Sequence, residues 1–115
     1  MVKKQSGIMK KVSQYLAEAN NICQVEKAIL FGSYAAGSAN KQSDIDIAIF
    51  SREVTNENRL EIMTKLIALT GKFRLDIQPV AFPYEDYISD ENDFIVNEIK
   101  NKGFAFNPTQ LEAAG

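Results

Sequence analysis

Apolar residues follow helical spacing in two long stretches of the chain and strand-like spacing in three short ones. Helices are expected from about Gln5 to Cys23, and from an N-cap at Thr55 to a stop at Gly71. Buried or alternating apolar runs predict strands over three segments: Lys27–Phe31, Asp44–Phe50 and Phe73–Phe82. The pattern therefore predicts a chain in which helices and strands follow one another.

The same spacing assigns faces to these elements. The first helix is expected to bury one stripe of side chains, and the second helix another: Ile8, Val12, Tyr15, Leu16 and Ala19, then Leu60, Met63, Leu66 and Ile67. In the third strand the two faces are expected to be Leu75, Ile77 and Pro79 against Arg74, Asp76 and Gln78. Because Pro79 has no N–H to donate, this strand is predicted to lie at a sheet edge or to be bulged there.

The rest of the chain predicts shorter elements. A short helical turn is expected over Ser33–Gly37, and Pro83 favours a short helix to about Ser89. A last helix carries Phe94, Ile95 and Ile99, with Asp90 or Asn92 as its cap and Gly103 as its stop; Phe104–Phe106 is a short strand or a packed end. Residues 1–107 are expected to form a single domain, and residues 108–115 a flexible tail.

Composition narrows the function classes. The net charge of -2 offers no basic excess, so a long nucleic acid is not expected as the main ligand. The single cysteine cannot form an internal disulfide, which fits a reducing cytoplasm. The absence of histidine excludes Ser-His or Cys-His catalysis and most zinc sites. Carboxylates remain as the general bases. No segment is long and apolar enough to predict a membrane span.

Two aspartates at i and i+2 carry the chemistry. Asp44 and Asp46 begin an alternating strand, so they share a face at roughly 6.5 Å along the strand, while Ile45, Ile47 and Ile49 point the other way. Two carboxylates on one face can hold divalent metal ions. Alone, such a pair more often marks the solvent end of a strand; the upstream Gly-Ser loop and the buried strand before it favour metal binding.

Further candidates surround this pair. Gly32 lets a phosphate approach the backbone and the Ser33 hydroxyl can bond a phosphate oxygen, although Gly-Ser also occurs in ordinary turns. Asp76 could complete a carboxylate triad and take a proton from an attacking hydroxyl, or it could be an exposed aspartate paired with Arg74 or Lys72. Lys41 is either a phosphate contact or a solvated loop lysine.

These residues resemble a known signature. Gly32-Ser33, a spacer of ten residues, then Asp44-Ile45-Asp46 resembles the motif of the DNA polymerase β-like nucleotidyltransferase superfamily. The fuller string Gly-Ser-x-Ala-x-Gly over residues 32–37, followed by Ser43-Asp44-Ile45-Asp46-Ile47, is most similar to its minimal nucleotidyltransferase branch. Arg74-Leu75-Asp76-Ile77 resembles the strand of the third aspartate, and the ending Glu98–Gly103 the closing helix. The likeness covers roughly Lys27 to Phe106.

The resemblance implies the fold, the cofactor and the reaction. The fold would be α/β, a small mixed sheet flanked by helices. Asp44, Asp46 and Asp76 would hold magnesium, two ions being expected, and Asp76 would assist the acceptor hydroxyl. The triphosphate would be held by a separate set: Gly32, Ser33, Lys41 and Ser43. The enzyme would transfer a nucleoside monophosphate from a nucleoside triphosphate to a hydroxyl, and AMP from ATP is the expected group. Relatives carry arginines where Tyr34 and Ala36 stand here.

Three functions follow from the resemblance and the small size of the chain. The first is the antitoxin of a toxin–antitoxin pair, modifying a hydroxyl on a small helical HEPN-type partner protein. The second is a binding module that neutralises or scaffolds the partner by contact, which the missing loop arginines favour. The third is an antibiotic-modifying enzyme built as a homodimer. The acceptor, the base and any homo-oligomer stay open.

Overall fold

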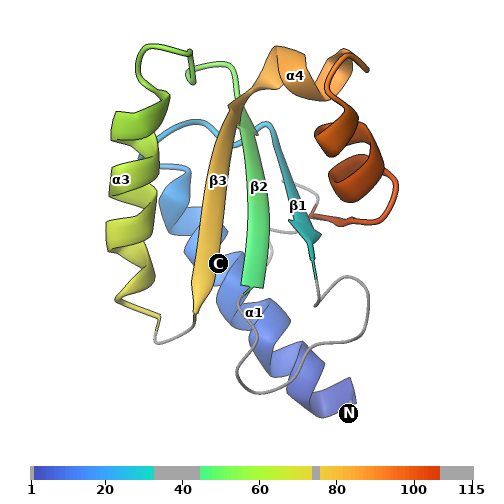
Figure 1. The fold of residues 1–115 in the computed structure, drawn as a ribbon. Helices are drawn as coiled ribbons and strands as arrows, with labels where there is room; N and C mark the ends of the chain where they lie inside the picture. Colours follow the sequence, from blue (N-terminus) through green and yellow to red (C-terminus); the bar gives the residue numbers. More distant parts are fainter. Residues whose placement is uncertain (1, 33–44, 74–75, 107–115) are drawn as a thin grey trace.

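A four-stranded mixed sheet forms the centre of the protein in a computed structural model, which describes residues 2–32, 45–73 and 76–106 (Figure 1). The strands are β1 (Lys27–Phe31), β2 (Ile45–Ser51), β3 (Ile77–Pro83) and β4 (Phe104–Phe106), in the order β3-β2-β1-β4. β1 pairs antiparallel with β2 and β4, and β2 pairs parallel with β3. The sequence therefore predicted the fold class correctly.

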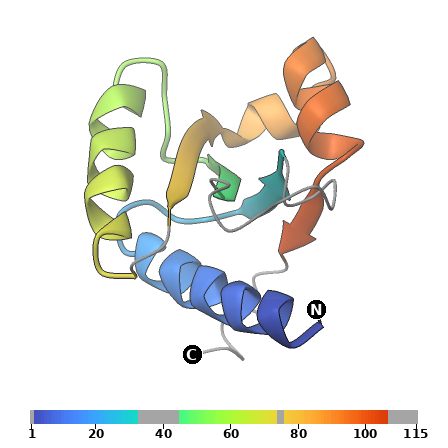
Figure 2. The same cartoon turned by 60° about the horizontal axis from the view of Figure 1, so that its bottom comes forward.

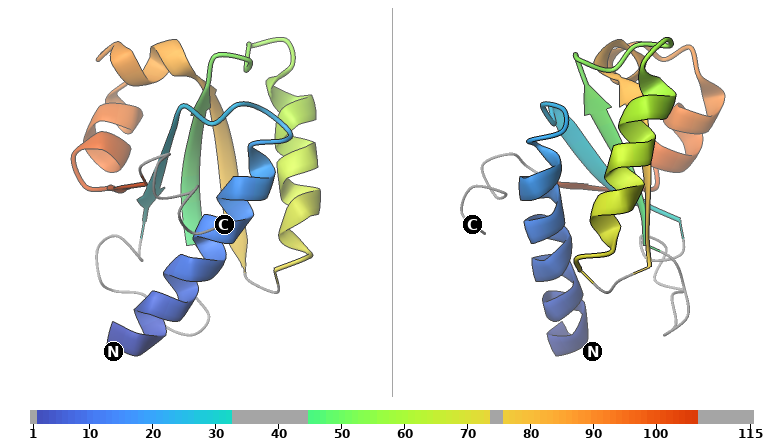
Figure 3. Two further views of the ribbon diagram at one scale, coloured as in Figure 1. Left: turned by 180° about the vertical axis from the view of Figure 1, so that it is seen from behind. Right: turned by 90° about the vertical axis from the view of Figure 1, so that its left-hand side faces the viewer.

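Helices cover both faces of this sheet. α1 (Val2–Ala19) and α3 (Arg59–Thr70) lie on one face, and α4 (Tyr84–Ile88) and the π-helical η1 (Ile95–Lys100) lie on the other (Figures 2 and 3). α3 makes the crossover between the parallel strands β2 and β3. None of the helices in the described ranges is long and apolar enough to cross a membrane.

β2 is buried on both faces because it lies inside the sheet. Ile45, Ile47 and Ile49 pack toward α1 and α3, and Ala48 and Phe50 pack toward α4 and η1. The Phe50 ring stacks on Phe82 of β3 at 5.4 Å between ring centroids. A strand buried on both sides is rich in apolar residues at every position, and this describes Ile47–Phe50; the predicted alternation between a polar and an apolar face is seen only at Asp46.

The second helix departs from its prediction in both its cap and its face. Thr55 is not the N-cap: the helix begins at Arg59 after Asn58, and Thr55 and Asn58 instead bond each other across a turn, Thr55 N–H to Asn58 Oδ1 at 2.7 Å. Leu66 is buried and Met63 packs against the core, as predicted, but Leu60 and Ile67 are 77% and 53% exposed, and Ile62 is buried in their place. α3 is apolar on nearly every side, so spacing alone could not select its packed face.

Other boundaries shift by a few residues. α1 ends at Ala19, so the predicted stop at Cys23 is wrong, and residues 20–22 form a turn instead. Phe73 lies in the turn after α3, and β3 begins only at Ile77. The predictions for β1, for a short helix after Pro83, and for Asn92 as the cap of the last helix are confirmed. The Ser33–Gly37 turn and the 108–115 tail lie outside the described residues.

β3 is an edge strand, as Pro79 predicted, and its outer side offers few backbone groups for pairing. The Asp76 carbonyl accepts the Ile45 N–H at 2.7 Å. The backbone N–H and C=O groups of the even-numbered residues of this segment therefore point toward β2, and those of the odd-numbered residues point away from the sheet. Pro79 and Pro83 fall in the outward set and have no N–H. The Ala81 carbonyl, also outward, accepts the Arg59 Nε–H at 2.6 Å.

One buried hydrogen bond joins α1 to α3, and we expect it to contribute measurably to stability. The Tyr15 hydroxyl donates to the Leu66 carbonyl at 2.7 Å, inside the core. Burial raises the pKa of this phenol, so it stays protonated and can donate. Tyr15→Phe is expected to lower the free energy of unfolding by about 1 kcal/mol, measured by urea denaturation. Tyr84→Phe, on the partly exposed α4, is the control; equal midpoints for Tyr15→Phe and the unmodified protein would contradict the prediction.

Candidate functional site

Asp46 lies near the start of β2 and is partly exposed, whereas the rest of this strand is buried on both faces. It lies opposite Phe31 of β1 and Gln78 of β3 in the strand register. Its side chain shares the face of Ala48 and Phe50, further along the strand, and it is partly exposed while they are fully buried. The sequence correctly placed Asp46 on the face opposite Ile45 and Ile47. The carboxylate therefore lies at the open end of a face that is otherwise core.

Gly32 contacts this carboxylate directly after β1. Its φ is +76°, in the left-handed region that glycine adopts readily. A Cβ added at Gly32 would overlap the Asp46 Oδ2 atom. The first glycine of the loop is therefore required for two reasons, its backbone conformation and the space that the Asp46 carboxylate occupies.

Asp76 reaches the same end of the sheet from the neighbouring strand. It is exposed and immediately precedes β3, and its carbonyl is bonded to Ile45, the residue before Asp46. Of the two alternative partners, Lys72 pairs with Glu18 of α1, its ammonium lying 2.6 Å from that carboxylate, and Arg74 lies outside the described residues. The sheet thus brings together three of the predicted site residues: Gly32, Asp46 and Asp76.

The remaining predicted site residues lie outside the described residues: Ser33, Lys41, Ser43 and Asp44. Within residues 2–32, 45–73 and 76–106, no three cysteine, aspartate or glutamate side chains converge as metal ligands. The two aspartates that are described supply carboxylate oxygens, the donor type that magnesium prefers, and they meet at one end of the sheet. The donor chemistry therefore fits a magnesium ion.

Two neighbours of Asp46 were not assigned to the site from the sequence. Gln78 is exposed and lies beside Asp46 across the parallel pair. Phe31 lies on the other side, and its ring meets Phe94 edge to face at 6.0 Å between centroids. The polar face of the third strand pointed to Gln78, but only the register of β2 against β3 places it next to Asp46.

Cys23 takes no part in the site. It is buried in the core on the α1 face of the sheet. Burial raises the pKa of the Cys23 thiol, the nearby Glu53 charge raises it further, and the hydrogen bond with Ser51 lowers it. The net upward direction keeps the thiol protonated near neutral pH, as expected of a packing residue.

A surface hollow of about 620 Å³ lies at the opposite end of the sheet, where β2 and β3 end. Its lining includes Arg52, Glu57, Tyr84 and Glu85, and none of the predicted site residues that the structure describes is among its lining residues. This hollow is therefore separate from the end of the sheet at which Gly32, Asp46 and Asp76 lie.

Comparison with known proteins identifies the family to which the chain belongs. Residues 10–103 match the family model described as "Polymerase beta, Nucleotidyltransferase". A relative from Methanocaldococcus jannaschii, named a "putative protein adenylyltransferase", is 29% identical over 80 residues, 70% of this chain and 77% of the relative.

A solved structure shares the fold. It is described as a toxin–antitoxin crystal structure with AMP-PNP, and it superposes with a TM-score of 0.54 at 20% identity, over 89% of this chain and 79% of the other. The family match covers most of the chain, including Gly32, both aspartates of the Asp-Ile-Asp motif, and Asp76. The chain belongs to the polymerase β nucleotidyltransferase family.

Proposed function

We propose that this protein transfers AMP from magnesium-bound ATP to a hydroxyl group on a partner protein. The observation that carries the proposal is the meeting of Gly32, Asp46 and Asp76 at one end of the sheet. Nucleotidyl transfer needs two parts: a glycine turn that phosphate can approach, and metal-binding carboxylates on adjacent strands.

Each residue has a role in this proposal. Asp44, Asp46 and Asp76 hold magnesium, which when bound offsets the negative charge of the triphosphate. Backbone N–H groups at Gly32 and Ser33 bind phosphate oxygens, and Lys41 and Ser43 are proposed as further phosphate-binding residues. The acceptor oxygen attacks the α-phosphorus, the bond to the β-phosphate oxygen breaks, and pyrophosphate leaves. Asp76, exposed at the edge of the site, takes the proton from the acceptor hydroxyl.

The acceptor is proposed to be a small helical protein of the HEPN type, with this chain acting as its antitoxin. The name of the Methanocaldococcus jannaschii relative supports a protein as acceptor, and the description of the similar structure supports an adenine nucleotide and a toxin–antitoxin pair.

Nucleotide binding tests this proposal first. We expect calorimetry to detect ATP binding that requires magnesium, and Asp44→Asn to weaken it at least tenfold because a metal ligand is lost. Glu61→Gln on the outer surface of α3 is the control and should bind as the unmodified protein does. Magnesium-independent binding, or full binding by Asp44→Asn, would contradict the proposal.

The contact-only alternative rests on Tyr34 and Ala36, which stand where relatives carry phosphate-binding arginines. It makes a different prediction for the same variant. A contact inhibitor would still neutralise its partner after Asp44→Asn, whereas an enzyme would not.

A further inference from the structure

Three residues on neighbouring strands form a row across the sheet at the site. Gln78, Asp46 and Phe31 occupy matching register positions on β3, β2 and β1, with their side chains on the face covered by η1. Phe94, at the start of the last helix, contacts Phe31 of this row, with the two ring centroids 6.0 Å apart and the rings at 87° to each other. The Asp46 carboxylate is therefore bordered by polar groups on one side and by aromatic rings on the other.

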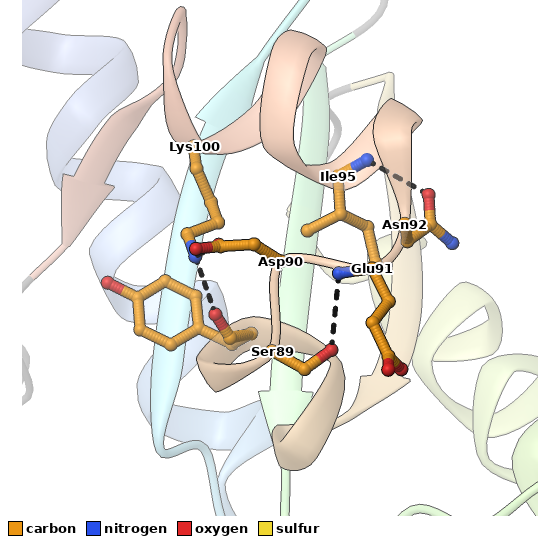
Figure 4. A network of polar contacts seen from close by, with 7 residues as sticks. Ser89, Asp90, Glu91, Asn92, Ile95 and Lys100 are labelled. Atoms are coloured by element: carbon orange, nitrogen blue, oxygen red, sulfur yellow. Dashed lines mark hydrogen bonds and ion pairs between the residues drawn. The ribbon is translucent and has the colours of Figure 1, made fainter.

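Phe94 is held firmly although its own ring is exposed. Figure 4 shows the turn that precedes its helix, where the Asn92 side chain caps the Ile95 N–H at 3.1 Å. Lys100 pairs with Asp90 at 2.7 Å across the same turn. The side chain of Ile95 is fully buried, so the residue next to Phe94 is anchored in the core.

The exposure of this ring is unusual for its position. Phe94 is 52% exposed, whereas Ile95 and Ile99 of the same helix are fully buried. Among the residues whose side chains the structure describes, the other exposed large apolar side chains are aliphatic: Leu60, Ile67 and Ile88. Phe94 is thus a flat, fixed aromatic surface next to the site, available to a planar group.

The two sides of Asp46 suit the two substrates differently. Asp76 and Gln78 lie on the β3 side, where the proton of the acceptor hydroxyl has to be removed. The β1 side carries Phe31 and Phe94, directly beside the glycine turn that receives the triphosphate. A nucleotide with its phosphates at Gly32 can extend its base over this aromatic side.

We infer that the Phe94 ring is the surface on which the nucleobase of the bound triphosphate stacks. The inference rests on the proposed function, because it assumes that the triphosphate binds at Gly32. Every base has a π-face, so stacking of this kind strengthens binding without selecting strongly among bases.

Phe94→Ala and Phe94→Leu test the inference. We expect both variants to bind magnesium-ATP about tenfold to a hundredfold more weakly by calorimetry, because stacking on one aromatic ring is lost. Phe94→Trp should bind as well as the unmodified protein or better. Leucine keeps an apolar contact with Phe31, so weak binding by the leucine variant isolates the loss of the ring.

Magnesium tripolyphosphate, which has no base, is the matched ligand. It should bind equally to all Phe94 variants, and Leu60→Ala, on the opposite face of the sheet, should leave both ligands unaffected. Unchanged ATP binding by Phe94→Ala would overturn the inference, as would an equal loss of ATP and tripolyphosphate binding. If the unmodified protein bound neither ligand, the proposed function itself would fail.

Discussion

Asp46→Asn is expected to slow AMP transfer about 10³-fold. The substitution removes a full negative charge at the point where Gly32, β2 and β3 meet, while the amide keeps the shape of the side chain. Through the metal ion it holds, such a carboxylate stabilises the transition state by several kcal/mol, and each 1.36 kcal/mol of lost stabilisation slows the rate about tenfold. The measurement is the rate of AMP incorporation into the helical partner protein, followed by intact mass.

The matched control is Asp86→Asn, in α4 at the opposite end of the sheet. It removes the same charge from the same type of residue and should transfer AMP at the unmodified rate. Transfer by Asp46→Asn within a few-fold of the unmodified rate would exclude Asp46 from the metal site. Loss of transfer with full neutralisation of the partner would instead support the contact-only module.

Gly32→Ala is expected to damage both stability and nucleotide binding. Alanine at a φ of +76° costs about 1–3 kcal/mol, and its methyl group would also overlap the Asp46 carboxylate. The carboxylate would have to move away from the turn at Gly32, which is proposed to bind the triphosphate. We expect a lower free energy of unfolding in urea and at least tenfold weaker magnesium-ATP binding by calorimetry.

Gly71→Ala is the matched control for this substitution. Gly71 caps α3 with a φ of -61°, and a Cβ there would come no closer than 3.6 Å to the Ala68 carbonyl. Alanine is therefore expected to be tolerated or to stabilise by about 0.4–1 kcal/mol. Equal behaviour of the two alanine variants would show that neither the conformation nor the close approach at Gly32 matters.

Local patterns predicted the strands well where burial is regular. The run from Lys27 to Phe31 forms β1 with those bounds, and Pro79 identified the edge strand. The predictions failed where two local solutions compete. Thr55 and Asn58 are both good capping residues. In the structure the Thr55 hydroxyl accepts the Asn58 N–H and the Asn58 side chain donates to the Glu53 carbonyl, so Thr55 belongs to the turn before the helix.

The candidate site divides in the same way. Gly32, Asp46 and Asp76 could be named from the sequence because residue type and spacing carry their chemistry. Gln78 and Phe94 could not, because their positions depend on the register between strands and on where the last helix packs. Ser33, Lys41, Ser43 and Asp44 lie outside the described residues, so their roles remain predictions.

The outer edge of β3 limits how this protein can assemble. An exposed strand edge invites a second chain to pair with it, which is a common route to domain swapping and aggregation. Here the two prolines and the arginine bond to Ala81 interrupt the row of backbone groups that such pairing needs. A molecule that covers this flank has few backbone groups to pair with and is expected to bind mainly through side chains, so recognition there depends on sequence more than on the backbone that all strands share.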